Sequence, residues 1–558
     1  MLFDLKRAGA SLLILFALNF TVYANRIVVK NQHDFEQLAE AVSEQLNRGR
    51  NVEVQIREGI YYYSDKHLLL KDIIKPKLSV KINCREAIFV PKASETEITP
   101  YHAVIRNLKD ANLWSGMFIT SEKVAVIDAT KKLCRIKRGE NLDVKEGGYI
   151  LLTRWYTSGL YKIEKVERDY IYFTASNTRY REKYGEYDVN FDYVYNESYP
   201  RYKLLITDNL PDDCYVCSSS SFLSIQNCQF SKFEINGLKF VGGSGQDAVV
   251  KLGGLKASTV KLTNCIFLDL HNNAIALKST DNVTIDRCEF ANCYSTTVTA
   301  DENCSHLIVK KCLWRECGQL LENPSCVIAS GVYYVIKGNT FVDFCGRALT
   351  LGVYYSKGND VHSSGVIENN DFYFTPSFLE TAHQNLLMDN GAIYVNTLND
   401  HLEIRNNYIH DFSGACDNRG IFLDDGAMNV KITGNVITNV PNGAAISARR
   451  VKSVESTVGA VNMGNSIQGN VYEGIIRFVG NEVDSNGCEY GDNYHLVQLG
   501  NDCPKTIVKN VHLIGEDVVL ICTGNEKAKI CIDGKSYKQI KKSPVWKKVK
   551  KKFSRKNK

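Results

Sequence analysis

The apolar positions of this chain recur in a short repeated unit. Each copy has two apolar residues separated by one position, a Cys or Asn three residues later, and an aromatic residue or Ile two positions further on. The Cys or Asn positions, called the ladder here, are 23 to 46 residues apart. They are Cys228, Cys265, Cys288, Cys312, Asn339, Asn370, Asn407, Asn435, Asn481 and Asn510. A second apolar strand follows many of them, as at 274–277, 348–351 and 420–423.

A coil of about 23 residues with short strands and no helical period predicts an all-β fold, a right-handed parallel β-helix. Leucine-rich repeats are the main competitor, but their fixed leucine spacing is absent. A bend must fall between the apolar pair and the ladder residue, because strand side chains alternate between faces. The ladder residues are therefore expected to stack inside a turn, and their role is interpreted as structural.

The first 24 residues have the pattern of a secretory signal peptide. Lys6 and Arg7 precede an apolar run over 8–20, and the small-residue ending 22–24 predicts cleavage after Ala24. No later segment has the roughly 18 apolar residues of a membrane span. The protein is therefore expected to be exported, to the periplasm, the outer surface or the medium.

The remaining chain divides into four parts. Residues 25–100 are expected to hold an N-terminal cap and the first coils, with a helix from Asp34, as N-cap, to Leu46. Residues 101–215 lack the ladder and predict an inserted β-rich subdomain. Residues 216–515 form the predicted β-helix with the candidate active site. Residues 516–558 predict a hairpin and a basic tail, which would bind an anionic polymer or a membrane surface, or be merely solvated.

Composition and cysteine spacing argue against extensive disorder, a nucleic-acid partner and a metal site. Hydrophobic residues at 44% and charged residues at 23% are typical of a folded chain, and a net charge of +6 is small for 558 residues. We expect no nucleic-acid partner. The 18 Cys raise the question of disulfides, but the ladder favours packed thiols. The lone C-x-x-C at 214–217 has no second pair at zinc spacing, so no metal site is predicted.

Candidate chemistry lies between 389 and 450. Long grooves along a β-helix suit polymeric ligands, and hydrolysis of a glycosidic bond needs two carboxyl groups. The acidic residues of this segment are Asp389, Asp411, Asp417, Asp424 and Asp425. Counted from the ladder, Asp424 is level with Asn396 of the preceding coil and Asp425 with Thr397. In the next coil either Ser447 or Arg449 is level with Asp424.

Arg449 beside Asp424 would hold that carboxylate ionised, while a more apolar setting keeps another carboxyl protonated. His410 would assist proton transfer or orient a carboxylate. The catalytic candidates are Asp389, Asp424, Asp425 and His410, and the substrate-binding candidates are Tyr394, Asn396, Asp411, Arg449 and Arg450. Adjacent Asp residues also form turns, and that alternative stays open.

The segments 389–394 (DNGAIY), 407–411 (NYIHD), 420–426 (GIFLDDG) and 432–436 (ITGNV) resemble the core of secreted bacterial β-helix proteins of the pectate-lyase-like superfamily. In particular they resemble glycoside hydrolases of family 141, which include fucosidases and xylanases. The resemblance implies that the catalytic carboxylates are Asp389 and either Asp424 or Asp425.

Three hypotheses follow. The first is an exported enzyme, a glycoside hydrolase acting on a polysaccharide or oligosaccharide without a cofactor. The second is a polysaccharide lyase or uronate epimerase, which would need calcium and an Arg or Lys base. The third is a non-catalytic glycan-binding or surface scaffold, whose Asp residues only close turns.

Overall fold

The computed structural model describes the β-helix in nearly continuous segments and the rest in shorter ones. The described residues are 26–92, 103–106, 114–119, 125–128, 131, 133–137, 146–147, 149–154, 157–174, 201–205, 214–217, 221–243, 247–293, 295–318, 325–352, 363–378, 390–395, 399–412, 418–423, 427, 430–438, 443–449, 466–468, 471–473, 475–479, 497–499, 507–509, 512–514 and 520–522.

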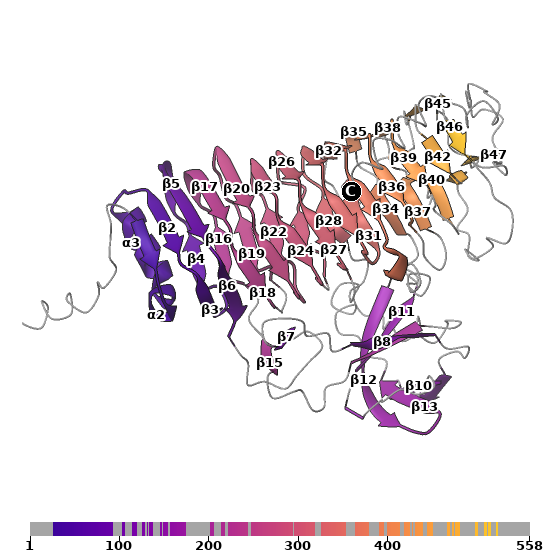
Figure 1. Ribbon diagram of the computed structural model, residues 1–558, viewed down its shortest axis with the longest axis horizontal. Coiled ribbons are helices and arrows are strands. Elements are labelled where there is room, and N and C mark those ends of the chain that lie inside the picture. Colours follow the sequence, from indigo (N-terminus) through magenta and orange to yellow (C-terminus); the bar gives the residue numbers. More distant parts are fainter. Residues whose placement is uncertain are drawn as a thin grey trace, which may run out of the picture.

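Three parallel sheets, called A, B and C, run the length of the molecule (Figure 1). Sheet A contains β1 (Arg26–Val29), β2 (Val52–Ile56), β5 (Ile74–Cys84), β17 (Gln229–Asn236), β20 (Thr259–Thr263), β23 (Val283–Asp286), β26 (Leu307–Lys310), β29 (Tyr334–Lys337), β32 (Ser363–Glu368), β35 (Asn399–Arg405), β38 (Val430–Thr433), β41 (Ser466–Gln468) and β45 (Ile507–Lys509). Sheet B contains β3 (Gly59–Tyr63), β6 (Ala87–Pro91), β18 (Lys239–Val241), β21 (Ile266–Leu268), β24 (Glu289–Ala291), β27 (Leu313–Arg315), β30 (Thr340–Val342), β33 (Asp371–Tyr373), β36 (Tyr408–His410), β39 (Val436–Thr438), β42 (Val471–Glu473) and β46 (His512–Ile514). Sheet C contains β4 (Leu68–Lys71), β16 (Leu223–Gln226), β19 (Val250–Gly253), β22 (Ile275–Lys278), β25 (Val298–Ala300), β28 (Ser325–Ala329), β31 (Arg347–Leu351), β34 (Asn390–Val395), β37 (Asn418–Leu423), β40 (Gly443–Arg449) and β43 (Ile475–Val479).

Each coil passes from sheet C to sheet A to sheet B, so the molecule has a C–A corner, an A–B corner and a B–C corner. Within sheets A, B and C the described strands pair in parallel with their counterparts one coil away, as the repeat predicts. The strands are short because a coil must turn three times, and each coil buries its apolar face only against its neighbours.

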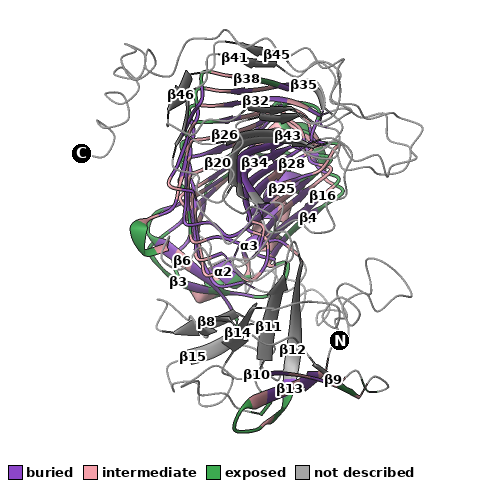
Figure 2. Cartoon of the chain, turned by 90° about the vertical axis from the view of Figure 1, so that its right-hand side faces the viewer, coloured by how far each residue is buried: buried purple, intermediate pink, exposed green. Residues whose placement is uncertain are grey.

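The core lies inside the coil, where buried residues line the inner walls (Figure 2). On sheet B the middle residue of each strand from β18 to β36 is buried, and successive rings stack along the axis. Phe267, Phe290, Trp314, Phe341 and Phe372 form one such stack, with centroids 5.1, 4.8, 4.5 and 4.9 Å apart. The strand spacing of about 4.8 Å explains these distances, since each ring is anchored to one strand.

The ladder occupies the A–B corner. Asn339, Asn370, Asn407 and Asn435 are buried, and each of the first three donates its side-chain amide to the next Asn Oδ1 at 2.9–3.0 Å. Each amide also donates to a carbonyl of the preceding coil; for Asn407 this is Ile367 O, at 2.9 Å. The thiols use the same geometry, because Cys312 Sγ donates to Ile285 O at 3.7 Å.

Two ends of the predicted ladder are wrong. Phe233 pairs with Val260 and Ile235 with Leu262, so Leu238 takes the position before Cys265, and Cys228 lies at the C–A corner instead. At the other end Val436 pairs with Val471, and Val471 with His512. The ladder spacing therefore continues at positions 470 and 511, and the predicted steps at Asn481 and Asn510 do not match the strand register.

Two helices at one end of the solenoid form a cap, α2 (Gln32–Glu36) and α3 (Leu38–Asn47). The predicted single helix from Asp34 is wrong at its start, because the N-cap is Asn31, whose side chain accepts from the Asp34 N–H at 2.9 Å. Phe35 and other apolar residues of the helices pack into the end of the core.

Between β6 and β16 the chain leaves the coil and forms antiparallel sheets beside it (Figure 1). The strands outside sheets A, B and C are β7 (Ala103–Arg106), β8 (Trp114–Ile119), β9 (Ala125–Asp128), β10 (Leu133–Lys137), β11 (Tyr149–Arg154), β12 (Thr157–Val166), β13 (Tyr170–Thr174), β14 (Arg201–Leu205), β15 (Cys214–Cys217), β44 (Val497–Leu499) and β47 (Leu520–Cys522). Strand β47 pairs in parallel with β44. Residues 528–532, its expected hairpin partner, lie outside the described residues.

Candidate functional site

The described residues include only part of the predicted site. Tyr394, His410 and Asp411 are described with their side chains, and Arg449 by its backbone alone. The other predicted site residues, Asp389, Asn396, Asp424, Asp425 and Arg450, lie outside the described residues.

His410 stands at the end of β36 and is held by two carboxylates. Its Nδ1 lies 2.7 Å from Asp411 Oδ2, and its Nε2 lies 3.2 Å from Asp371 Oδ1 on the neighbouring strand β33. A doubly protonated ring donates to both oxygens. The ring is stacked between Tyr373 and Tyr408, at centroid distances of 4.9 and 4.0 Å. These five residues are called the histidine cluster.

The charge of the histidine cluster follows from its contacts. Burial alone would lower the pKa of His410, but the hydrogen bonds and negative charges of Asp371 and Asp411 outweigh burial, so its pKa is raised above the ordinary value of 6.5. The two contacts of the His410 ring hold both carboxylates in place. Asp411 remains accessible, since 43% of its side chain is exposed.

We expect the stabilising effect of His410 to depend on pH. A raised folded-state pKa gives stability that is fully present below the unfolded value of 6.5 and is lost as pH rises through the folded value. His410→Gln should therefore lower the free energy of unfolding by about 1.5–3 kcal/mol near pH 5 and by less at alkaline pH. Urea titrations across pH measure this. His401→Gln, at an exposed site, is the control, and a loss independent of pH would contradict the assignment.

A second carboxyl group lies on the same side of the coil, just after β30. Asp343 accepts hydrogen bonds from the Thr375 N–H at 2.6 Å and the Thr375 hydroxyl at 2.8 Å. Burial nevertheless raises the pKa of the Asp343 carboxyl. Val342, Tyr373 and His410 share one register position on three successive strands. Asp343 and Asp411 each follow this position, two coils apart, so this wall holds carboxyl groups in unlike environments.

Two buried arginines lie on sheet C, Arg347 on β31 and Arg419 on β37. Arg347 Cζ lies 3.5 Å from the ring centroid of Tyr394, and Arg419 Cζ lies 3.8 Å from that of Phe422. The two rings meet edge to face at 5.2 Å. Arg347 is 8% exposed and Arg419 is 5% exposed. Buried guanidinium groups require negative or π partners, so these residues, the arginine cluster, favour an ionised carboxylate close by.

The strand register constrains the predicted carboxylates. Asn390 pairs with Asn418 at the start of β34 and β37, and Val395 pairs with Leu423 at their ends. Asp389 and Asp417 therefore precede paired residues, whereas Asp424 follows the far end. Five residue steps span about 17 Å, so a pair of Asp389 with Asp424 requires the chain to bend back outside the described strands.

The same register resolves an alternative that the sequence left open. Ser447 pairs with Phe422 and Ala448 with Leu423, so Ser447 is not the residue level with position 424, and Asp424 itself lies outside the described residues. In the preceding coil Ile393 pairs with Ile421.

Sequence reasoning missed Asp371, Tyr373 and Tyr408, and the two arginines. A usable signal was present, because the segments 371–373 (DFY) and 408–410 (YIH) occupy the same place in successive repeats, and their outer residues must adjoin. Arg347 is the first residue of β31 and Arg419 is the second residue of β37. The sequence repeat has no recurring residue at these positions, so it did not indicate them.

Among the described residues, no group of three or more His, Cys, Asp or Glu side chains is arranged to hold a metal ion. No described helix is long and apolar enough to cross a membrane.

The three parallel sheets and their internal ladder define the chain as a right-handed parallel β-helix protein. The family described as the right handed beta helix region matches residues 254–458, the part that contains most of the ladder and both clusters.

Solved structures with this fold are similar at low identity. A structure titled glycoside hydrolase has 8% identity and a TM-score of 0.43, and covers 91% of this chain and 96% of that one. The Gp54 tailspike of Acinetobacter baumannii bacteriophage AP22, in complex with A. baumannii capsular saccharide, has 8% identity and a TM-score of 0.23, with 90% and 75% covered. The tailspike gp61 of Pseudomonas phage phi297 has 10% identity and a TM-score of 0.20, with 87% and 73% covered. No curated protein matches the chain.

Proposed function

We propose that this protein is a carbohydrate-active enzyme that hydrolyses glycosidic bonds through a pair of Asp carboxylates. The observation that carries the proposal is the histidine cluster, in which the His410 ring is hydrogen-bonded to a partly exposed carboxylate, Asp411, beside two tyrosine rings. Tyrosine rings offer flat apolar faces with a polar edge, which suits contact with sugar rings. The histidine cluster lies on sheet B, whose strands continue over the neighbouring coils on both sides.

Asp389 is proposed as one catalytic carboxyl group, with Asp424 or Asp425 as the second. One carboxylic acid protonates the glycosidic oxygen as the bond to the anomeric carbon breaks. The other carboxylate activates a water molecule, or itself attacks that carbon before water completes the hydrolysis. The arginine cluster supports an ionised group close to β34 and β37, and Asp343 illustrates that burial on the sheet B wall raises a carboxyl pKa.

The strand register makes Asp411 an alternative second carboxyl group beside Asp389. Strand β36 ends at His410, and the chain then reaches Asn418, the neighbour of Asn390, within eight residues. Asp411 begins this connection, so it lies on the same B–C corner as the residue before Asn390. In this arrangement His410 is a positioning residue, because both of its nitrogen atoms already contact carboxylates.

Export is part of the proposal, because polysaccharides are met outside the cytoplasm, and the expected signal peptide at 1–24 would supply it.

A glycan panel tests the function. Purified protein is incubated with xylan, galactomannan, fucose-containing oligosaccharides and polygalacturonate, and both new reducing ends and unsaturated-uronate absorbance are measured. We expect new reducing ends without the absorbance on at least one glycan. Unsaturated products would instead indicate the lyase, and binding without any cleavage would indicate the scaffold.

A further inference from the structure

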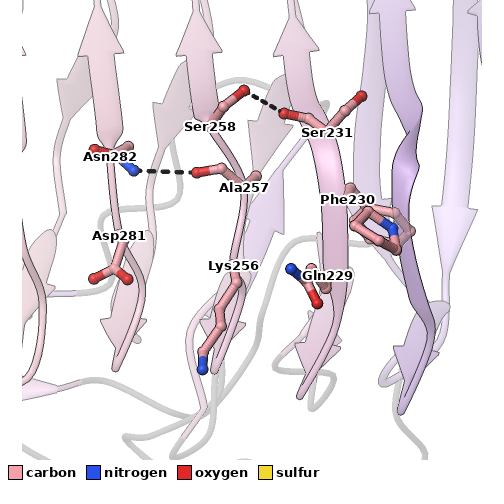
Figure 3. Close-up of a pocket in the computed structure, with 9 residues that line it drawn as sticks. Gln229, Phe230, Ser231, Lys256, Ala257, Ser258, Asp281 and Asn282 are labelled. Carbon is pink, nitrogen blue, oxygen red and sulfur yellow. Dashed lines mark hydrogen bonds between the residues drawn. The ribbon is translucent and has the colours of Figure 1, made fainter.

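A hollow of about 380 Å³ opens at the C–A corner, near the capped end of the solenoid (Figure 3). It is lined by residues of four successive coils, the first of which contributes only Pro76. The polar ones are Gln229, Ser231, Lys256, Ser258, Asp281 and Asn282. The volume falls within the range of about 300–1,000 Å³ that is usual for small-molecule sites.

The hollow arises from a step in the length of the corner. The chain takes eight residues from Leu252 to Val260, but only six from Leu277 to Val283, although these residues pair across the coils. The coil before also takes eight, from Ile225 to Phe233. Two coils therefore project beyond the third, and the hollow is built into the backbone.

The lining presents donors and acceptors on a fixed frame. The Ser258 hydroxyl donates to Ser231 O at 2.5 Å, and Asn282 Nδ2 donates to Ala257 O at 3.2 Å. Figure 3 shows the side chains of Gln229, Lys256 and Asp281 pointing the same way from adjacent coils. An amide, an ammonium and a carboxylate on successive coils, whose backbones are about 4.8 Å apart, match a ligand that carries many hydroxyl groups in regular sequence.

The same corner continues toward the predicted catalytic segment. In the next coil the Ser305 hydroxyl donates to Asp281 Oδ1 at 2.7 Å, and His306 lies beside Tyr333, with ring centroids 5.9 Å apart. Tyr333 is 39% exposed. Strand β37, which leads into Asp424, is six strands beyond β19 in sheet C, or about 29 Å at ~4.8 Å per strand.

We propose that this hollow is a distal binding subsite for a polysaccharide that lies along the C–A corner and reaches the segment after β37. The inference rests on the proposed function only in taking the segment after β37 as the catalytic end of the bound polysaccharide. A polymer long enough to span both places gains affinity from the hollow, whereas a short oligosaccharide at the catalytic end does not.

Two variants test the subsite. Gln229→Ala/Lys256→Ala removes two polar groups, and Ser258→Trp fills the hollow. Lys261→Ala, an exposed lysine on the sheet A strand of the same coil, is the control. Binding is measured by retardation in native gels cast with xylan, galactomannan or polygalacturonate. For a polymer that is cleaved, KM and kcat are compared with those for a short oligosaccharide of the same sugar.

We expect one polysaccharide to retard the wild-type protein, and both hollow variants to bind it about tenfold more weakly, with kcat on the short substrate unchanged. Retardation that is equal in the wild type, the variants and the control would overturn the subsite, as would no retardation by any of the three polymers. Retardation that the variants weaken, without hydrolysis in any assay, would support the subsite and contradict the proposed hydrolase.

Discussion

Asp389→Asn should reduce glycan hydrolysis by about 10²–10⁴-fold in kcat, because an amide can neither donate a proton to the leaving oxygen nor act as a base. Either Asp424→Asn or Asp425→Asn should do the same, and the other should not, since adjacent residues project differently from the chain. Asp411→Asn is measured beside them. Initial rates on the cleaved glycan and the pH profile of kcat are compared for all four variants.

Glu234→Gln is the matched control, because it makes the same change from carboxyl to amide on the outer face of sheet A, away from both clusters. If Asp411→Asn is inactive while Asp424→Asn and Asp425→Asn are active, the catalytic pair is at the B–C corner. Full activity in Asp389→Asn would exclude this residue from catalysis under either pairing.

Asn407→Ala should destabilise the protein by about 3–5 kcal/mol. The side chain is buried, donates to Ile367 O and Asn435 Oδ1, and accepts from the Asn370 N–H and side-chain amide. Alanine leaves a backbone carbonyl and a backbone N–H of neighbouring coils without these partners, and each unsatisfied buried group costs about 1–3 kcal/mol. Urea unfolding followed by circular dichroism measures the loss.

The comparison is Cys288→Ala at the thiol end of the ladder. Cys288 Sγ donates to Leu262 O at 3.6 Å, a longer and weaker contact than the amide makes. Its removal should cost clearly less than that of Asn407. Equal losses for the two variants would mean that the ladder stabilises the corner by filling space and not by hydrogen bonding.

The fold was predictable because the β-helix repeats its pattern in the sequence, and seven of the ladder positions were found. Cys228 misled the prediction for a physical reason. Strand β16 on sheet C and the strands of sheet A both alternate apolar residues, and both are followed by a turn that accepts a small buried side chain. Spacing alone does not distinguish two corners of one coil.

The candidate site was less predictable. His410 and Asp411 are adjacent in the sequence, but Asp371 is 39 residues before His410 and meets it only through the pairing of β33 with β36. Such a contact is not visible in the sequence, because the connection between the two strands varies in length from coil to coil. The residues that adjoin are known only when the register of both strands is known. The arginine cluster depends in addition on which side of the sheet C strands is buried, which the apolar pattern does not reveal.

The buried thiols have a consequence for how this chain reaches its native state. The structure describes the side chains of eleven cysteines, which are all buried and form no disulfide, and desolvation raises the pKa of Cys84 and Cys304 to about 12. Folding therefore keeps Cys84 and Cys304 in the thiol form and away from the thiolate form that oxidants attack. The thiols of an unfolded chain are exposed to solvent. In an oxidising compartment, folding of the β-helix therefore competes with random disulfide formation. The speed of winding, more than final stability, then governs the yield of active protein.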